Sequence, residues 1–378
     1  MLISADLVYV NGSLKPGLAV ETDGRQVTAL RPLGANERAT QHVTLLAPGL
    51  TDLQVNGGGG VLVNTDPTPE GFRRIRRAHL RLGTAAIMPT VITDAPEVTE
   101  AAAEAAIACK GEAGLLGLHI EGPHIAPARC GTHDARHIRP LDRRMMDTLR
   151  RLRGAGVPVI LTLAPELADP SLLHEAQAMG IVLSGGHSTA SAAQTRQGIA
   201  DGLTMFTHLF NAMPHMQSRE PGIVAAAILS EAYLGLIADG IHVDWDMLRI
   251  AIAARPRKGR CFLVSDAMPT VGGPDSFTLY GQEIHVRDGR LINAEGALAG
   301  AHVSLLDCVR RLHRNAGVPL AEALEMAIEI PRRALGVGEP EPAISPGMPL
   351  EELLALQGES LDLVEPDGEG AAKPIALG

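Results

Sequence analysis

Eight apolar runs of strand length alternate with helical stretches between residues 48 and 335 of this 378-residue chain. The runs are Leu50–Val55, Ala85–Val91, Leu115–Ile120, Val159–Leu163, Ile181–Leu183, Thr204–Thr207, Leu234–Ile237 and Cys261–Val264. Eight repeats of strand and helix predict a closed parallel (β/α)₈ barrel of the TIM type. An open doubly wound sheet is the alternative, but no glycine-rich dinucleotide or phosphate-binding turn follows any of the runs.

Composition narrows the class of protein. Hydrophobic residues make up 46% of the chain and aromatic residues only 2%, which suits a barrel interior filled by branched aliphatic side chains. A net charge of −10 argues against nonspecific nucleic-acid binding. The sequence shows no signal peptide and no apolar run of membrane-spanning length, and its four cysteines form no paired motif, so we expect a cytoplasmic protein.

The segments outside the repeat favour strands. The dipeptides Asn11-Gly12 and Asp23-Gly24 follow short apolar runs and predict hairpin turns. Residues 271–300 read as a β-hairpin excursion after the eighth run, and Leu361–Val364 as a strand that returns to the N-terminal sheet. We therefore expect residues 1–47 to begin a small β-domain, residues 48–335 to form the barrel, and residues 336–378 to return in part to the β-domain.

Seven of the eight runs end in polar clusters, the second being the exception. In a barrel these strand ends converge on one face, where active sites of barrel enzymes lie. Glu121, His187 and His208 come from three such ends. One carboxylate and two imidazoles form a plausible open site for Zn²⁺ or Fe²⁺. The alternative is a set of buried histidines bonded to backbone carbonyls, which three equivalent strand ends disfavour.

Further polar residues have two interpretations each. Asp266 ends the eighth run and suits a general base, or a helix N-cap. Gln54 and Asn56 face one side of the first strand, where they hydrogen-bond a ligand or orient the site, or, for Asn56, form a turn. His133 and His242 either bind substrate, polarise a carbonyl, or are ordinary loop histidines. Arg219, before Pro221-Gly222, is either part of an anion site or a solvated surface residue.

The ordered set of motifs from residue 48 to residue 337 resembles the N-acetylglucosamine-6-phosphate deacetylases, a branch of the amidohydrolase superfamily. The motifs that carry the resemblance are residues 48–57 (PGLTDLQVNG), 119–123 (HIEGP), 131–133 (GTH), 163–166 (LAPE), 186–188 (GHS), 207–214 (THLFNAMP), 219–222 (REPG), 238–243 (ADGIHV) and 263–267 (LVSDA). Many motifs in order make the match far more specific than any one of them.

The resemblance implies a reaction and roles for residues. The reaction removes acetate from N-acetylglucosamine 6-phosphate and leaves glucosamine 6-phosphate. Glu121, His187 and His208 would hold the catalytic metal, Asp266 would act as base and then as acid, and His133 would polarise the acetyl carbonyl. The residues that would hold the sugar phosphate are Asn211, Ala212, His242 and Arg219, the last reaching the neighbouring subunit's site in a homodimer.

Some positions depart from the pattern. Superfamily relatives with two metals carry His-x-His at the end of the first strand, where this chain has Gln54 and Asn56, so we expect one metal ion per chain. His124 stands where an apolar residue is common, and the tail after Gly336 matches poorly. The rival interpretations are another amidohydrolase, acting on a different N-acyl sugar or a cyclic amide, and a non-catalytic barrel scaffold.

Overall fold

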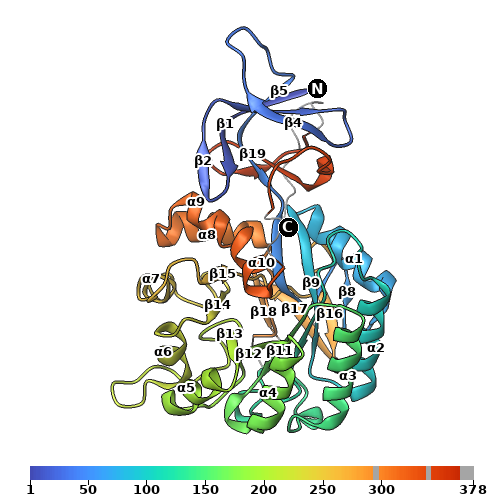
Figure 1. The fold of residues 1–378 in the computed structure, drawn as a ribbon, viewed down its shortest axis with the longest axis vertical. Helices are drawn as coiled ribbons and strands as arrows, with labels where there is room; N and C mark the ends of the chain where they lie inside the picture. Colours follow the sequence, from blue (N-terminus) through green and yellow to red (C-terminus); the bar gives the residue numbers. More distant parts are fainter. Residues whose placement is uncertain (293–297, 338–341, 367–378) are drawn as a thin grey trace.

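The computed structural model describes residues 1–292, 298–337 and 342–366. Figure 1 shows a barrel surrounded by helices and a smaller sheet at one end, which contains the N-terminus. The chain passes from the small sheet into the barrel at Gly49, where a Cβ atom would lie 2.5 Å from the Cβ of Ala85 and 2.9 Å from the carbonyl oxygen of Glu352. The small sheet therefore adjoins the N-terminal end of the first barrel strand.

The barrel consists of eight parallel strands. They are β6 (Leu50–Val55), β9 (Thr84–Ile92), β10 (Leu118–Glu121), β11 (Val159–Leu163), β12 (Val182–Gly185), β13 (Leu203–Phe206), β14 (Tyr233–Leu236) and β15 (Cys261–Leu263), and neighbours in this order pair in parallel. The edge strands β6 and β15 approach each other through a parallel bridge between Val55 and Ala267. The predicted TIM-type barrel is confirmed, nearly closed and in the predicted strand order.

Helices connect the strands. They are α1 (Pro69–Leu80), α2 (Pro96–Ala108), α3 (Arg143–Gly154), α4 (Pro170–Ala178), α5 (Ala192–Ala200), α6 (Gly222–Ile228), α7 (Trp245–Ala253), α8 (Leu305–Ala316), α9 (Leu320–Glu325) and α10 (Glu329–Leu335), with 3₁₀ turns η1 (Pro127–Arg129), η2 (Ala135–His137), η3 (Pro165–Leu167) and η4 (Leu350–Glu352). Six helices begin at a Ser, Thr or Asp whose side chain accepts a backbone N–H of the first turn. None of the helices in the described ranges has both the length and the apolar character needed to cross a membrane.

The small sheet joins both ends of the described chain. Its strands are β1 (Leu2–Val10), β2 (Ser13–Lys15), β3 (Leu18–Thr22), β4 (Val27–Pro32), β5 (Gln41–Pro48), β19 (Leu353–Gln357) and β20 (Asp362–Leu363), in the order β20-β19-β5-β1-β3-β4 with β2 on β1. The predicted hairpin at Asn11-Gly12 joins β1 to β2, with both residues at positive φ. The predicted returning strand is β20, but it pairs with β19, which the sequence did not reveal. The division at residues 47 and 335 stays a prediction.

A three-stranded antiparallel sheet follows β15, where the excursion was predicted. Its strands are β16 (Ser276–Leu279), β17 (Gln282–Arg287) and β18 (Arg290–Ile292). The turns at Tyr280-Gly281 and Asp288-Gly289 hold all four residues at positive φ. A short ribbon of β7 (Gly57–Gly58) and β8 (Val61–Leu62) follows β6, and Leu62 packs against this excursion. The three-stranded sheet and the β7–β8 ribbon each follow the carboxyl end of a barrel strand, and they help to enclose the barrel face where the strands end.

Candidate active site

Three side chains converge at the carboxyl ends of neighbouring strands. Glu121 is the last residue of β10, His187 lies two residues beyond β12, and His208 two residues beyond β13. Oε1 of Glu121 is 3.1 Å from Nε2 of His187 and 2.9 Å from Nε2 of His208, and the two Nε2 atoms are 3.0 Å apart. All three residues are at most 5% exposed. The predicted convergence of these three residues is therefore present in the fold.

The electrostatics of this group suit a cation. Nδ1 of His187 lies 2.8 Å from the backbone oxygen of Arg129, which only accepts, so Nδ1 carries a proton and Nε2 is the nitrogen left to face the cavity as a ligand. Although burial opposes it, the neighbouring His187 and His208 hold the pKa of Glu121 well below its usual value. Burial lowers the pKa of His208, but Glu121 outweighs it and raises that pKa overall. The carboxylate is thus charged and attracts positive charge to this point.

The spacing of these atoms also fits a metal ion. Ligands of a tetrahedral Zn²⁺ at roughly 2.0–2.1 Å lie about 3.3 Å from one another. The three contacts of 2.9–3.1 Å between Glu121, His187 and His208 are close to that value. Side-chain oxygen and nitrogen atoms of Glu121, His133 and His187 also lie within 4.8 Å of one another, so a second ligand set shares two of its members with the first.

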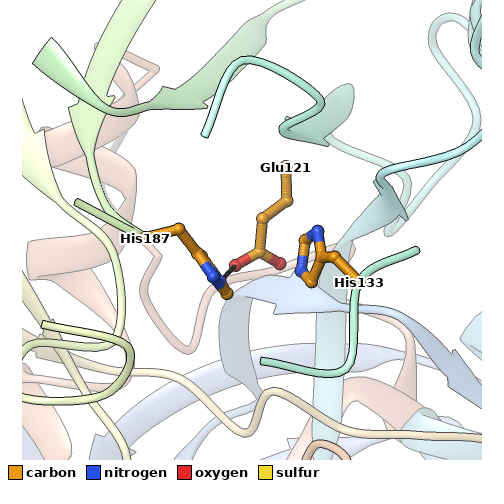
Figure 2. A group of neighbouring side chains, drawn as sticks. All are labelled: Glu121, His133 and His187. Atoms are coloured by element: carbon orange, nitrogen blue, oxygen red, sulfur yellow. Dashed lines mark hydrogen bonds and ion pairs between the residues drawn. The ribbon is translucent and has the colours of Figure 1, made fainter. Parts of the chain in front are cut away.

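His133 lies beside this group. Figure 2 shows its ring next to the Glu121 carboxylate, and the centroids of the His133 and His187 rings are 4.4 Å apart. Burial lowers the pKa of His133 to about 3. Nδ1 of His133 is 2.7 Å from Oγ1 of Thr93 and accepts the Thr93 N–H at 3.3 Å. His133 is therefore a neutral imidazole whose Nδ1 is already bonded.

Asp266 follows β15 and lies where the edge strands β15 and β6 approach each other. Its Oδ1 accepts hydrogen bonds from Nε2 of Gln54 at 3.0 Å and from Nδ2 of Asn56 at 2.7 Å. Gln54 also donates to Oε2 of Glu121 at 3.1 Å. Burial, then the charge of Glu121, raises the pKa of Asp266 to about 6. Asp266 caps none of the helices described, so its N-cap interpretation is wrong.

Backbone strain gathers at the same place. His187, His208 and Asp266 have φ angles of 47°, 28° and 53°, in the left-handed region that residues with a side chain seldom adopt. Phe210 and Ala212, in the loop after β13, have φ angles of 81° and 53°. Such strain persists only where the surrounding structure imposes it, and it clusters at functional sites.

A cavity of about 250 Å³ opens onto these groups. Its lining includes most of the residues predicted for the site: Asn56, Glu121, His133, His187, His208, Asn211, Ala212, His242 and Asp266. Apolar side chains of Ile92, Met268 and Leu298 complete part of the wall. Gln54 does not line the cavity but donates hydrogen bonds to Asp266 and Glu121. Arg219 is an exposed residue of the loop between β13 and α6.

Two neighbouring features of the site were not predicted. Below the ligand group, a buried chain of hydroxyls joins Ser184, Thr207 and Thr162 at 2.6 Å steps and ends on Nε2 of His119 at 2.7 Å. Thr207 immediately precedes His208, so this row of hydroxyls connects the strand that leads to His208 with β10 and β12.

The second feature is Thr93, which follows β9, the strand whose end has no predicted polar cluster. Isolated hydroxyl residues carry no sequence signal for such contacts.

Comparison with known proteins adds to this geometry. A family model described as the amidohydrolase family matches residues 45–348. The chain belongs to the amidohydrolase family. Among the curated members, it is 39% identical to an N-acetylgalactosamine-6-phosphate deacetylase of Shewanella sp. strain ANA-3, over 86% of this chain and 84% of that protein. It is also 30% identical to an N-acetylglucosamine-6-phosphate deacetylase of Haemophilus influenzae, over 88% of this chain and 89% of that protein.

Solved structures of amidohydrolases agree with the fold. The N-acetylglucosamine-6-phosphate deacetylase of Pasteurella multocida superposes with a TM-score of 0.86 at 29% identity, covering 96% of each chain. The likeness therefore extends over the small sheet as well as the barrel of this amidohydrolase.

Proposed function

We propose that this chain hydrolyses the acetamide of N-acetyl-D-glucosamine 6-phosphate to D-glucosamine 6-phosphate and acetate. The observation that carries the proposal is one cavity that holds a carboxylate–imidazole ligand group, a carboxyl group with a raised pKa and a neutral histidine. Amide hydrolysis needs these functions: activation of water, stabilisation of the oxyanion and a proton for the leaving nitrogen. Relatives that deacetylate amino-sugar phosphates support the choice of substrate.

The proposed metal ligands are Glu121, His187 and His208, holding one Zn²⁺ or Fe²⁺ per chain. When bound, such an ion makes water a nucleophile near neutral pH and polarises a carbonyl. The alternative set, in which His133 replaces His208, requires Nε2 of His133 to carry no proton. The Thr93 N–H already occupies the Nδ1 lone pair, so a neutral His133 carries its proton on Nε2 and is a poor ligand. The geometry therefore favours His208.

Asp266 is the proposed general base and acid. Gln54 and Asn56 both bind its Oδ1, which fixes the carboxyl plane and leaves Oδ2 to exchange the proton. Asp266 takes a proton from the attacking water and delivers it to the amine that leaves. The two amides were predicted to bind substrate, and that role stays a prediction; their contacts support a role in holding Asp266 and Glu121.

The sugar phosphate is the proposed ligand of the loop after β13 and of His242. Asn211, Ala212 and His242 all line the cavity, and Nδ1 of His242 is held by Asp239 at 2.6 Å. Arg219 is exposed and does not line the cavity of its own chain, which is consistent with a role at the neighbouring site of a homodimer. We propose that dimer, and a cytoplasmic location, together with this function.

A second candidate substrate is N-acetylgalactosamine 6-phosphate. The Shewanella relative named for that activity is 39% identical to this chain, against 30% for the Haemophilus protein. The two sugars differ only in the configuration at one hydroxyl-bearing carbon, so the same catalytic group would serve both. The deciding quantity is the ratio of the two kcat/KM values.

The test measures acetate release from both phosphorylated sugars and from unphosphorylated N-acetylglucosamine, with metal content determined on the same preparation. The proposal predicts rapid release from N-acetylglucosamine 6-phosphate and slow release from the unphosphorylated sugar. Faster release from N-acetylgalactosamine 6-phosphate would reassign the substrate and keep the chemistry. A metal-loaded, folded sample that releases acetate from none of the three would reject deacetylation of amino sugars.

A further inference from the structure

Thr93 lies directly after β9, and its hydroxyl is enclosed by the site. Thr93 is 1% exposed. A Cβ atom added to Gly122, the residue after Glu121, would lie 2.2 Å from Oγ1 of Thr93, so Gly122 leaves room for this hydroxyl. The hydroxyl thus lies between the backbone beside Glu121 and the ring of His133.

The contacts of Thr93 determine which nitrogen of His133 carries the proton. The backbone N–H of Thr93 is 3.3 Å from Nδ1 of His133, and a backbone N–H can only donate. Nδ1 must therefore present a lone pair, and the Thr93 hydroxyl, 2.7 Å from the same atom, donates to it as well. A neutral imidazole with a lone pair on Nδ1 has its proton on Nε2. Within the described residues, Nε2 makes no hydrogen bond and remains available to a ligand in the cavity.

We propose that Thr93 is a positioning residue that fixes the tautomer and orientation of His133, so that Nε2–H donates to the acetyl oxygen of the substrate. The inference rests on the proposed deacetylation. Without the two donors at Nδ1, the ring could carry its proton on Nδ1 and present a lone pair to the oxygen, which would repel it. The hydrogen bond to the developing negative charge depends on the correct tautomer.

The fold holds the segment that contains Thr93 from both sides. Tyr280, at the turn between β16 and β17, donates its hydroxyl to the Thr93 carbonyl at 2.5 Å. The amide of Asn64 binds both the N–H and the carbonyl of Ile92, each at 3.0 Å, and also donates to Asp94 at 2.9 Å. The three-stranded sheet after β15 therefore anchors Thr93, the residue that orients His133.

The test compares Thr93→Val with Thr93→Ser in the metal-loaded enzyme. Valine has nearly the shape of threonine but cannot donate, so we expect kcat to fall about tenfold, with KM and metal content unchanged. Serine keeps the hydroxyl and should restore most of the activity. Thr84→Val is the matched control, because Thr84 is a buried threonine at the start of β9 whose hydroxyl has no hydrogen-bond partner among the described residues. This control should retain wild-type kcat.

Two further measurements separate positioning from a structural role. In a His133→Ala background, Thr93→Val should have no further effect on kcat, since Thr93 acts through His133. The ¹⁵N spectrum of histidine-labelled, zinc-loaded protein should show His133 protonated on Nε2 alone. An equal loss in both backgrounds, or a proton on Nδ1 in the wild-type protein, overturns the inference. If the wild-type protein releases no acetate, the proposed function fails, while the spectrum still decides the tautomer of His133.

Discussion

Replacing Asp266 by asparagine is the sharpest perturbation of the proposed chemistry. Oδ1 of Asp266 accepts from Gln54 and Asn56, and the carbonyl oxygen of an asparagine side chain can accept the same two hydrogen bonds. We therefore expect Asp266→Asn to keep its fold and its metal. The variant loses only the ability to take and deliver a proton at the second oxygen.

The expected size of the effect follows from that single loss. A positioned general acid–base group contributes about 10²- to 10⁴-fold to rate, or roughly 3–5.5 kcal/mol of transition-state stabilisation. Because the hydrogen bonds that fix the side chain survive, the loss should fall on kcat, with little change in KM. The assay is acetate release under substrate saturation, with metal content measured on both proteins.

Glu329→Gln provides the matched control. Glu329, the first residue of α10, is another carboxyl group with a raised pKa and is only 2% exposed. It accepts a hydrogen bond from the Tyr9 hydroxyl and does not line the active-site cavity. The same change from carboxyl to amide there should leave kcat at the wild-type value. Metal-loaded Asp266→Asn with a kcat within about threefold of wild type would refute the acid–base assignment.

Three other outcomes are expected. Burial raises the pKa of Glu329 to about 7 from 4.5, so the folded state holds this proton more tightly and wild-type stability falls as pH rises from 4.5 to 7. Urea unfolding should therefore show Glu329→Gln more stable than wild type by about 3 kcal/mol near pH 8 and by about 1 kcal/mol near pH 5. The same difference in unfolding free energy at both pH values would contradict a raised pKa of Glu329. Arg219→Ala should raise KM for the phosphorylated sugar about tenfold and leave the unphosphorylated sugar unaffected, as steady-state kinetics would show; a kcat defect on both sugars would argue against phosphate binding. His208→Ala should lose its metal in elemental analysis, whereas His133→Ala should retain it; the reverse result would favour the alternative ligand set.

The fold was largely predictable because strand patterns in a parallel barrel are strong. All eight apolar runs correspond to observed strands, and the site residues at their ends were found because ligand-type residues recur at equivalent positions. β19 was missed because Leu353–Gln357 lacks the alternation typical of a half-buried strand, its first four residues being buried. Its pairing with β5 depends on a contact between distant parts of the chain, which local pattern does not encode.

The supporting contacts of the site were less predictable. Sequence spacing placed Gln54 and Asn56 on one face of a strand, but only the folded chain shows that both bind Asp266. Thr93 escaped notice because a lone hydroxyl after a strand has no distinctive pattern, and its partner His133 lies 40 residues further along the chain. Predicting such contacts requires the path of the loops, which pattern and propensity leave undetermined.

The most direct test of the central claim is acetate release from N-acetylglucosamine 6-phosphate, with metal content measured on the same sample. We expect rapid release, about one divalent metal ion per chain, and loss of both metal and activity on chelation, with recovery when the metal is restored. A folded protein carrying that metal and releasing no acetate from either phosphorylated amino sugar would contradict it.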